Sequence, residues 1–339
     1  MREKSIQIRK FIIDNVGNNP KDIILLTTKK YGITRQAVQR YMQKLVIEGL
    51  ITKIGNTRNM QYIAKPIYEF RKMFSIDKLK EDSVWRENIK PCLKDIQKNV
   101  FEICEYGFTE ILNNAIEHSK GKDVIVELKY FPTYLMFRIW DDGIGIFNNI
   151  KKKFNLDNEL ESILELSKGK LTTNPENHTG EGIFFTSRMF DEFKISSGKL
   201  YFCHSEHDND WLFEEDKDLI GGTMVELIIN LNSNRVCQQI FDNYLTKDHY
   251  GFTKTNIPVT LARYGEDSLI SRSQAKRLLN RVDRFKEIVL DFKGVKSIGQ
   301  AFTDEIFRVF KNKNPKINLH YINATPEVIK MILRVINSI

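Results

Sequence analysis

The chain has 339 residues, of which 41% are hydrophobic and 28% are charged. This composition is typical of a globular protein and excludes a disordered or collagen-like chain, and the length suggests two or three domains. No apolar run approaches the roughly 18 residues of a membrane span, and the N-terminal MREKSIQIRK lacks the apolar segment of a secretion signal. The four cysteines and six histidines show no zinc-ligand spacing. We therefore expect a cytoplasmic protein that has no membrane partner.

The net charge of +8 is concentrated at the beginning of the chain. Residues 1–64 hold twelve Lys or Arg against four Asp or Glu, whereas the rest of the chain holds forty of each. A basic segment on a neutral body indicates a polyanion partner for that segment alone. A solvated basic surface without a partner is the alternative.

Residues 1–64 follow the pattern helix, helix, turn, helix, hairpin. Apolar residues recur at helical spacing in the first part, and Pro20 and Gly32 suit the start and the end of a second helix. Thr34 can cap a third helix, and two short strands are predicted around Gly55.

The stretch ITRQAVQRYMQKLVIEGLI within residues 1–64 resembles the winged helix–turn–helix family of bacterial regulators. The resemblance implies that the third helix enters the major groove of duplex DNA while the hairpin contacts the backbone. Arg and Gln side chains can pair bidentately with guanine and adenine edges. The implied DNA-contacting residues are Arg35, Gln36, Gln39, Arg40 and, in the hairpin, Arg58. A winged helix that contacts only proteins is the alternative.

Residues 65–98 are interpreted as a linker and a short helix that leads into the next domain, and a long helix follows. One face of that long helix carries Glu110, Asn114 and His118, each four residues apart. This spacing stacks a carboxylate, an amide and an imidazole on one side of the helix. Such a row suits a metal ion and a water better than an apolar core.

Three glycine-containing segments follow at strand and helix ends. The second of two alternating strands runs into DDGIG (residues 141–145), where a carboxylate can accept a hydrogen bond from a flat ligand that approaches the backbone. TGEG (residues 179–182) opens a helix whose backbone N–H groups can face a phosphate. GGT (residues 221–223) opens a last strand.

The order FTEILNNAIEHS, DDGIGI, HTGEGIFFTSRMF, GGTMVEL resembles the N, G1, G2 and final Gly-Thr boxes of the GHKL ATPases, a superfamily that joins histidine kinases, gyrase and MutL. The resemblance implies an α/β sandwich in which helices over a mixed, mostly antiparallel sheet hold Mg-ATP. It implies that Glu110 is the general base, that Asn114 is the magnesium ligand, and that Asp141 accepts the adenine amino group. Residues 147–179 would form the ATP lid.

Further nucleotide-binding residues are implied by the same boxes. Glycines in G1 would admit adenine, and glycines in G2 would face the phosphates. Anti-sigma-factor serine kinases typically carry a basic residue at the position of His178, and a neutral imidazole stabilises phosphoryl charge less than a guanidinium does. The further nucleotide-binding residues implied in this way are His118, Gly143, Gly145, His178, Thr179, Gly180, Gly182 and Thr223.

The last third of the chain alternates strands and helices, beginning with VTLARYG, which predicts a sheet flanked by helices. The phrase IVLDFKGVKSIGQAFTDEIFRVF resembles the STAS-like domains related to anti-sigma-factor antagonists, over about residues 257–339. Gln300 occupies the position of that family's phosphorylatable serine, and Ser297 is a poor substitute. We expect no covalent switch at Gln300, but we expect the helix that begins there to lie near the lid.

The sequence therefore predicts a multidomain α/β protein in which Mg-ATP controls the docking of the STAS-like domain and the presentation of the winged helix to DNA. Two alternatives stay open: a serine kinase acting on a sigma-factor-like or other regulator, and a MutL-type ATPase that dimerises over its lid. A homodimer stays open as well. The predicted divisions are a winged helix (1–64), a linker with its short helix (65–98), a GHKL α/β sandwich (99–232), and a connector with a STAS-like α/β domain (233–339).

Overall fold

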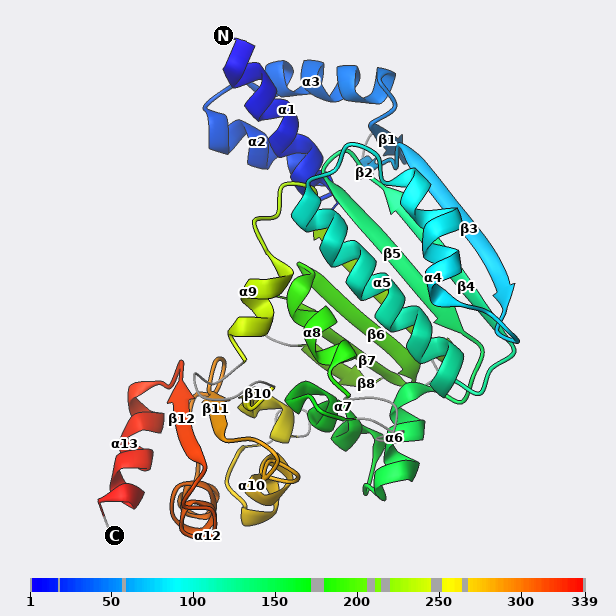
Figure 1. The fold of residues 1–339 in the computed structure, drawn as a ribbon. Helices are drawn as coiled ribbons and strands as arrows, with labels where there is room; N and C mark the ends of the chain where they lie inside the picture. Colours follow the sequence, from blue (N-terminus) through cyan, green and yellow to red (C-terminus); the bar gives the residue numbers. More distant parts are fainter. Residues whose placement is uncertain are drawn as a thin grey trace.

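The computed structural model contains three packed units in chain order, and no helix in its described part has both the length and the apolar composition that crossing a bilayer requires. Figure 1 shows the N-terminal module and the C-terminal domain at opposite ends of a large central sheet. The residues described are 2–17, 19–56, 59–171, 180–205, 211–214, 220–244, 252–263 and 268–337.

The N-terminal module has the predicted order of elements. Thr34 caps the third helix by accepting a hydrogen bond from the backbone N–H of Ala37, and Gly32 adopts the left-handed conformation at the end of the second helix. The elements are α1 (Arg2–Val16), α2 (Ile23–Tyr31), α3 (Arg35–Ile47) and the antiparallel strands β1 (Ile51–Ile54) and β2 (Gln61–Ala64).

The core of this module is completed by residues of the central domain, from one of its strands and from the turn before that strand. Ile12, Val38 and Met42 are fully buried within the module, and they belong to the same buried cluster as Phe131 and Met136 of the central domain. Because part of its core comes from elsewhere in the chain, the module is fixed to one end of the central sheet.

The central sheet has seven strands in the order β3-β4-β5-β9-β6-β7-β8, and every neighbouring pair of these described strands is antiparallel. The expectation of a mixed sheet is therefore corrected to an antiparallel one. Consecutive strands explain half of these pairs, since β4 with β5, β6 with β7, and β7 with β8 follow one another in the chain with no helix between them. The strands are β3 (Tyr68–Ser75), β4 (Asp123–Tyr130), β5 (Tyr134–Asp141), β6 (Glu192–Gly198), β7 (Leu200–Ser205), β8 (Trp211–Glu214) and β9 (Ile220–Asn230).

Strand β3 lies inside residues 65–98, where the sequence predicted a linker and a short helix but no strand. Its eight residues pair with β4 from Tyr68 opposite Tyr130 to Ser75 opposite Asp123. After it, the short helix α4 (Glu81–Val84) and the turns that follow insert Trp85 and Ile89 into the core. This segment is thus an integral part of the central domain.

One face of the central sheet is covered by the helices α5 (Lys98–His118) and α8 (Gly182–Met189), as Figure 1 shows. Alternate residues of β4 and β5, such as Val126 and Phe137, are fully buried on that side. The opposite face carries cross-strand ion pairs, in which Glu226 binds the Nε atom of Arg138 at 2.6 Å and the Nζ atom of Lys194 at 3.0 Å.

The C-terminal domain has a three-stranded parallel sheet in the order β10-β11-β12, flanked by helices. Its first strand precedes the predicted VTLARYG, because the buried residues Thr255 and Ile257 alternate within β10 whereas residues 259–262 form a tight helical turn. The elements are β10 (Lys254–Pro258), α10 (Arg272–Leu278), β11 (Glu287–Asp291), α11 (Gln300–Asp304), α12 (Lys311–Lys313), β12 (Asn318–Ile322) and α13 (Pro326–Ile336).

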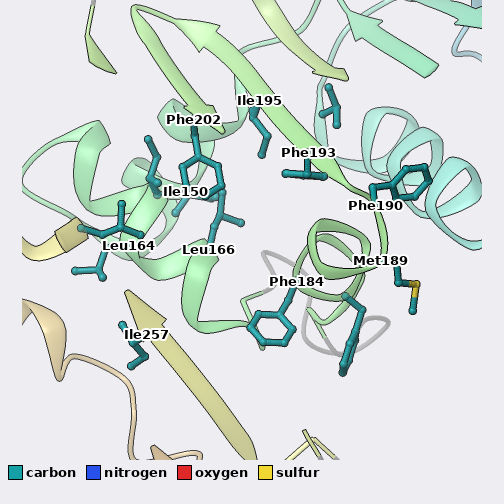
Figure 2. Close-up of a cluster of buried hydrophobic side chains, with 14 of the residues drawn as sticks. Ile150, Leu164, Leu166, Phe184, Met189, Phe190, Phe193, Ile195, Phe202 and Ile257 are labelled. Atoms are coloured by element: carbon teal, nitrogen blue, oxygen red, sulfur yellow. The ribbon is translucent and has the colours of Figure 1, made fainter. Parts of the chain in front are cut away.

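The central and C-terminal domains share one hydrophobic core. Figure 2 shows Phe193 and Phe202 of the central sheet, Leu164 and Leu166 of α7 (Glu159–Lys168), and Ile257 of β10 in the same buried region. Together with α6 (Ile146–Phe154), α7 lies at the end of the central sheet. The two domains are therefore packed together through α7.

The helix that begins at Gln300 does not make this contact. Gln300 is exposed, and α11 packs against α10 and α13, whereas α7 packs against β10 and the turn after it. For the described part of the lid, residues 147–171, the expectation that Gln300 lies near it is wrong, because the strand that faces α7 comes from the beginning of the domain.

Candidate functional site

A cavity of about 350 Å³ lies where α5, the end of β5, the start of α8 and β9 meet. The fold thus brings together four sequence motifs that are up to 113 residues apart, from Glu110 to Thr223. Predicted site residues that line the cavity are Glu110, Asn114, His118, Asp141, Gly145, Gly180, Gly182 and Thr223.

Helix α5 supplies one wall of the cavity with a row of polar side chains. Glu110, Asn114 and His118 are half-buried there, and Tyr106 lines the wall one turn earlier. Burial raises the pKa of Tyr106, and the nearby carboxylates of Glu110 and Glu181 raise it further. The phenol therefore stays neutral and can donate a hydrogen bond. Tyr106 is not among the residues predicted from the sequence, although the four-residue spacing continues back to it.

Asp141 ends β5 at the opposite wall. The side chain is only 5% exposed, and its Oδ1 atom accepts a hydrogen bond from the backbone N–H of Gly143 at 2.9 Å. Burial raises the pKa of Asp141 to about 6, against the lowering effect of the backbone hydrogen bonds from Gly143 and Thr223. This carboxylate thus has an acceptor lone pair available to a ligand in a poorly solvated place.

Thr223 connects two walls of the cavity. Its hydroxyl accepts a hydrogen bond from the backbone N–H of Ile146 at 2.9 Å, which ties β9 to the first residue of α6. On the same helix, the side-chain amide of Asn149 donates to the carbonyl of His118 at 3.1 Å. Asn149 also lines the cavity, and nothing in the sequence distinguished it from other polar residues of the segment.

Two glycines allow close approaches around the cavity. A Cβ atom at Gly182 would overlap the Oε2 atom of Glu110, so the glycine lets this carboxylate lie against the start of α8. A Cβ atom at Gly143 would overlap the carbonyl oxygen of Ser119. Gly143 does not line the cavity but packs against the end of α5, so the structure places it beside the site.

An aromatic cluster extends from the cavity wall to the C-terminal domain. Phe241, on α9 (Cys237–Asp242) in the connector, lines the cavity and packs on Tyr106 and Phe185 with ring centroids 5.5 and 4.7 Å apart. Phe252 continues the cluster from Phe185 to Phe285 of the C-terminal domain. The polar composition of the connector gave no signal for this contact.

The predicted DNA-contacting residues on α3 lie on its free face. Arg35, Gln36, Gln39 and Arg40 are exposed, and they lie on the side of α3 opposite its buried residues. Arg58, His178 and Thr179 fall outside the described residues. Within the described part of the chain, no cluster of three or more His, Cys, Asp or Glu side chains could hold a metal ion.

Two parts of the chain match known protein families. Residues 86–201 match the histidine kinase-like ATPase domain, and residues 274–328 match a STAS-like domain of unknown function, DUF4325. The chain therefore contains a histidine-kinase-like ATPase domain and a C-terminal STAS-like domain. A domain of the first family implies nucleotide binding, usually with Mg²⁺.

One curated relative is a sensor protein. The chain is 33% identical over 75 residues to the sensor protein VraS of Staphylococcus saprophyticus. The similar segment covers 22% of this chain and 20% of that protein, so the chain spans only about a fifth of the relative that it matches.

Replacing Gly143 by alanine should destabilise the protein, because the new methyl group would overlap the backbone carbonyl of Ser119, which cannot move aside easily. We expect a loss of about 1–3 kcal/mol in the free energy of unfolding, measured by urea denaturation. Gly221→Ala is the matched control, since its Cβ would meet nothing within 4 Å. Equal stability of the two variants would contradict the close packing at Gly143.

Proposed function

We propose that the histidine-kinase-like ATPase domain binds Mg-ATP in this cavity and that nucleotide occupancy controls how the STAS-like domain and the N-terminal module are held. The observation that carries the proposal is the convergence of Asp141 and Thr223 at one part of the cavity wall with Glu110, Asn114 and Gly182 at another. A buried acceptor and a glycine-containing helix start are the groups that an adenine ring and a triphosphate require.

The adenine end is assigned to Asp141 and Thr223. An ionised carboxylate in a poorly solvated place accepts a strong hydrogen bond from an exocyclic amino group. Gly145, four residues after Asp141, also lines the cavity, and its lack of a side chain supports a flat ligand there. Thr223 would bind near the adenine, where its hydroxyl is already oriented by Ile146.

The phosphate end is assigned to Gly180, Gly182 and the start of α8. Backbone N–H groups at the start of a helix attract negative charge. The side-chain oxygen of Asn114 is a suitable ligand for Mg²⁺, which usually binds one or two protein groups and completes its shell with phosphate oxygens and water. When bound, Mg²⁺ neutralises phosphate charge. Glu110 would hold the proton of the attacking group.

The N-terminal module is proposed to bind duplex DNA. The whole net charge of +8 lies within residues 1–64, and Arg35, Gln36, Gln39 and Arg40 are exposed together on α3. An exposed helix with Arg and Gln on its outer face is suited to the major groove. Because α1 and α2 pack on the opposite side of α3, that face is free for a partner.

Nucleotide affinity should fall as the pH is lowered through about 6, the pKa of Asp141. A raised pKa means that the carboxyl is largely protonated at pH 5, and the protonated form loses the charge-assisted acceptor. If only the ionised form binds, Kd should rise about tenfold from pH 7.5 to pH 5. Titration of a fluorescent ATP analogue at both pH values measures this.

Asp141→Asn is the matched control for the pH experiment. The amide should bind nucleotide weakly at both pH values and show no pH dependence between them. A Kd of the unmodified protein that is the same at pH 5 and pH 7.5 would remove Asp141 from the adenine site.

Glu110→Gln should preserve nucleotide binding and lower any turnover of ATP, because the amide cannot take a proton. A positioned general base contributes about 10²–10⁴-fold to a rate. ATP labelled in its γ-phosphate, followed into free phosphate and into added protein, distinguishes an ATPase from a serine kinase. Glu102→Gln, on an exposed part of the same helix, is the control. Turnover that survives in Glu110→Gln would place the base elsewhere.

The full chain should bind duplex DNA with a steep dependence on salt. Each neutralised phosphate contributes a slope of about −0.9 in log K against log salt, so Arg40→Ala should weaken binding and flatten the slope by about one unit. Fluorescence anisotropy with genomic fragments measures both, and Lys313→Ala, exposed in the C-terminal domain, is the control. No affinity at low salt would leave the module as a protein-binding domain.

A further inference from the structure

Lys168, the last residue of α7, is buried completely between the central and C-terminal domains. Its ammonium group donates hydrogen bonds to Oε1 of Glu165 at 2.6 Å and to the backbone carbonyls of Arg277 and Asn280 at 3.1 and 2.8 Å. These three bonds use all three donors of the ammonium group. Two of them reach the end of α10 in the STAS-like domain.

The STAS-like domain returns hydrogen bonds to the same region. The hydroxyl of Thr255 donates to the carbonyl of Lys168 at 2.7 Å, and Nη1 of Arg284 donates to the carbonyl of Lys170 at 2.6 Å. Nη2 of Arg281 donates to the carbonyl of Phe154 at 3.0 Å, and its guanidinium lies over the Phe154 ring.

These contacts cap helix ends across the domain boundary. The last carbonyls of a helix have no partner within it, and donors or cations at that end stabilise it. Phe154 is the last residue of α6 and Lys168 is the last residue of α7, and both receive their donor from the STAS-like domain. Conversely, the ammonium group of Lys168 caps the end of α10 by donating to the carbonyls of Arg277 and Asn280.

The charges of Lys168, Arg281 and Arg284 meet at one carboxylate, that of Glu165. Glu165 is 2% exposed, and its second oxygen lies 3.6 Å from Nη1 of Arg281 and 4.0 Å from Nη2 of Arg284. Burial lowers the pKa of Lys168 to about 8, although Glu165 raises it, so the amine is still protonated at neutral pH. Removing one member of such a buried group leaves the other charges without a partner, and this lowers the free energy of unfolding.

The same segment forms part of the nucleotide cavity. Leu166, two residues before Lys168, and Leu171, three residues after it, both line the cavity. The backbone N–H of Leu171 also donates to the carbonyl of Gly180 at 3.1 Å, and Gly180 lines the cavity as well. Residues 166–171 therefore connect the cavity wall to the STAS-like domain without an intervening element.

We propose that the STAS-like domain is a structural part of the nucleotide site, with Lys168 and Arg284 as positioning residues that hold the segment 166–171 in its binding conformation. The inference rests on the proposed binding of nucleotide in the cavity. Docking of the STAS-like domain and nucleotide binding then support each other, since any coupling between two binding equilibria is reciprocal.

The test uses the full-length variant Lys168→Met, which keeps the length of the side chain and removes its charge. Lys276→Met, exposed on α10, is the matched control. Two measurements are made: Kd for a fluorescent ATP analogue with Mg²⁺, and hydrogen–deuterium exchange of the amides at the ends of α7 and α10, with and without nucleotide. Arg284→Met is the second variant, in case Lys168→Met does not fold.

We expect the Kd to rise by at least about tenfold in Lys168→Met and Arg284→Met and to stay unchanged in the control, which corresponds to about 1.4 kcal/mol of binding free energy. In the unmodified protein, nucleotide should slow exchange at the end of α10, and this protection should vanish in both variants. A residue with a purely structural role would not change that response to nucleotide.

Unchanged Kd and unchanged exchange in folded variants would overturn the inference. If nucleotide gave no protection of α10 in the unmodified protein, the inference would also be overturned even with a raised Kd in the variants, because the two domains would then be uncoupled. If the unmodified protein binds no nucleotide, the proposed function fails. In that case, faster exchange at the ends of α7 and α10 in Lys168→Met would still support the capping of these helices across the domain boundary. Equal exchange in Lys168→Met and the unmodified protein would contradict that capping.

Discussion

Seven consecutive residues of α7, Ser162 to Lys168, are buried, so the C-terminal half of this helix has no face in contact with solvent. A helix buried on every side is normally apolar, yet this one contains Glu165 and Lys168. Both charges require partners on a second domain, and the STAS-like domain provides backbone carbonyls and arginines for them. The close packing of the two domains therefore requires that Glu165 and Lys168 find partners on the STAS-like domain.

The antiparallel sheet explains why residues far apart in the chain converge on one cavity. Asp141 and Thr223 are direct cross-strand partners, so the register of β5 with β9 places the G1 aspartate beside the final Gly-Thr box. Helix α5 lies across the same sheet and brings its polar row to that point. Strand register and helix direction therefore determine which residues meet at the cavity.

The motif residues could be predicted from the sequence because each has a local signature: a four-residue spacing on a helix, or glycines at a strand or helix end. Strand β3 was hidden because an edge strand alternates weakly, with Phe70 and Phe74 among exposed charged residues. The burial of α7 could not be predicted, because the sequence ELESILELSK has the pattern of an ordinary amphipathic helix with one exposed side. Its polar side is buried only because a second domain packs on it. Phe241 was missed for the same reason, since its role depends on where the connector runs.

The shared core of the N-terminal module has a consequence for how this architecture could arise or be rearranged. Phe131, in the turn after β4, and Met136 of β5 complete that core. A chain that ended after β2 would therefore expose apolar surface that the intact protein covers. Exchange of the module for an unrelated one during evolution would require matching changes at the tip of β4 and β5. A substitution on either side of this shared core therefore affects the packing of both the N-terminal module and the central domain.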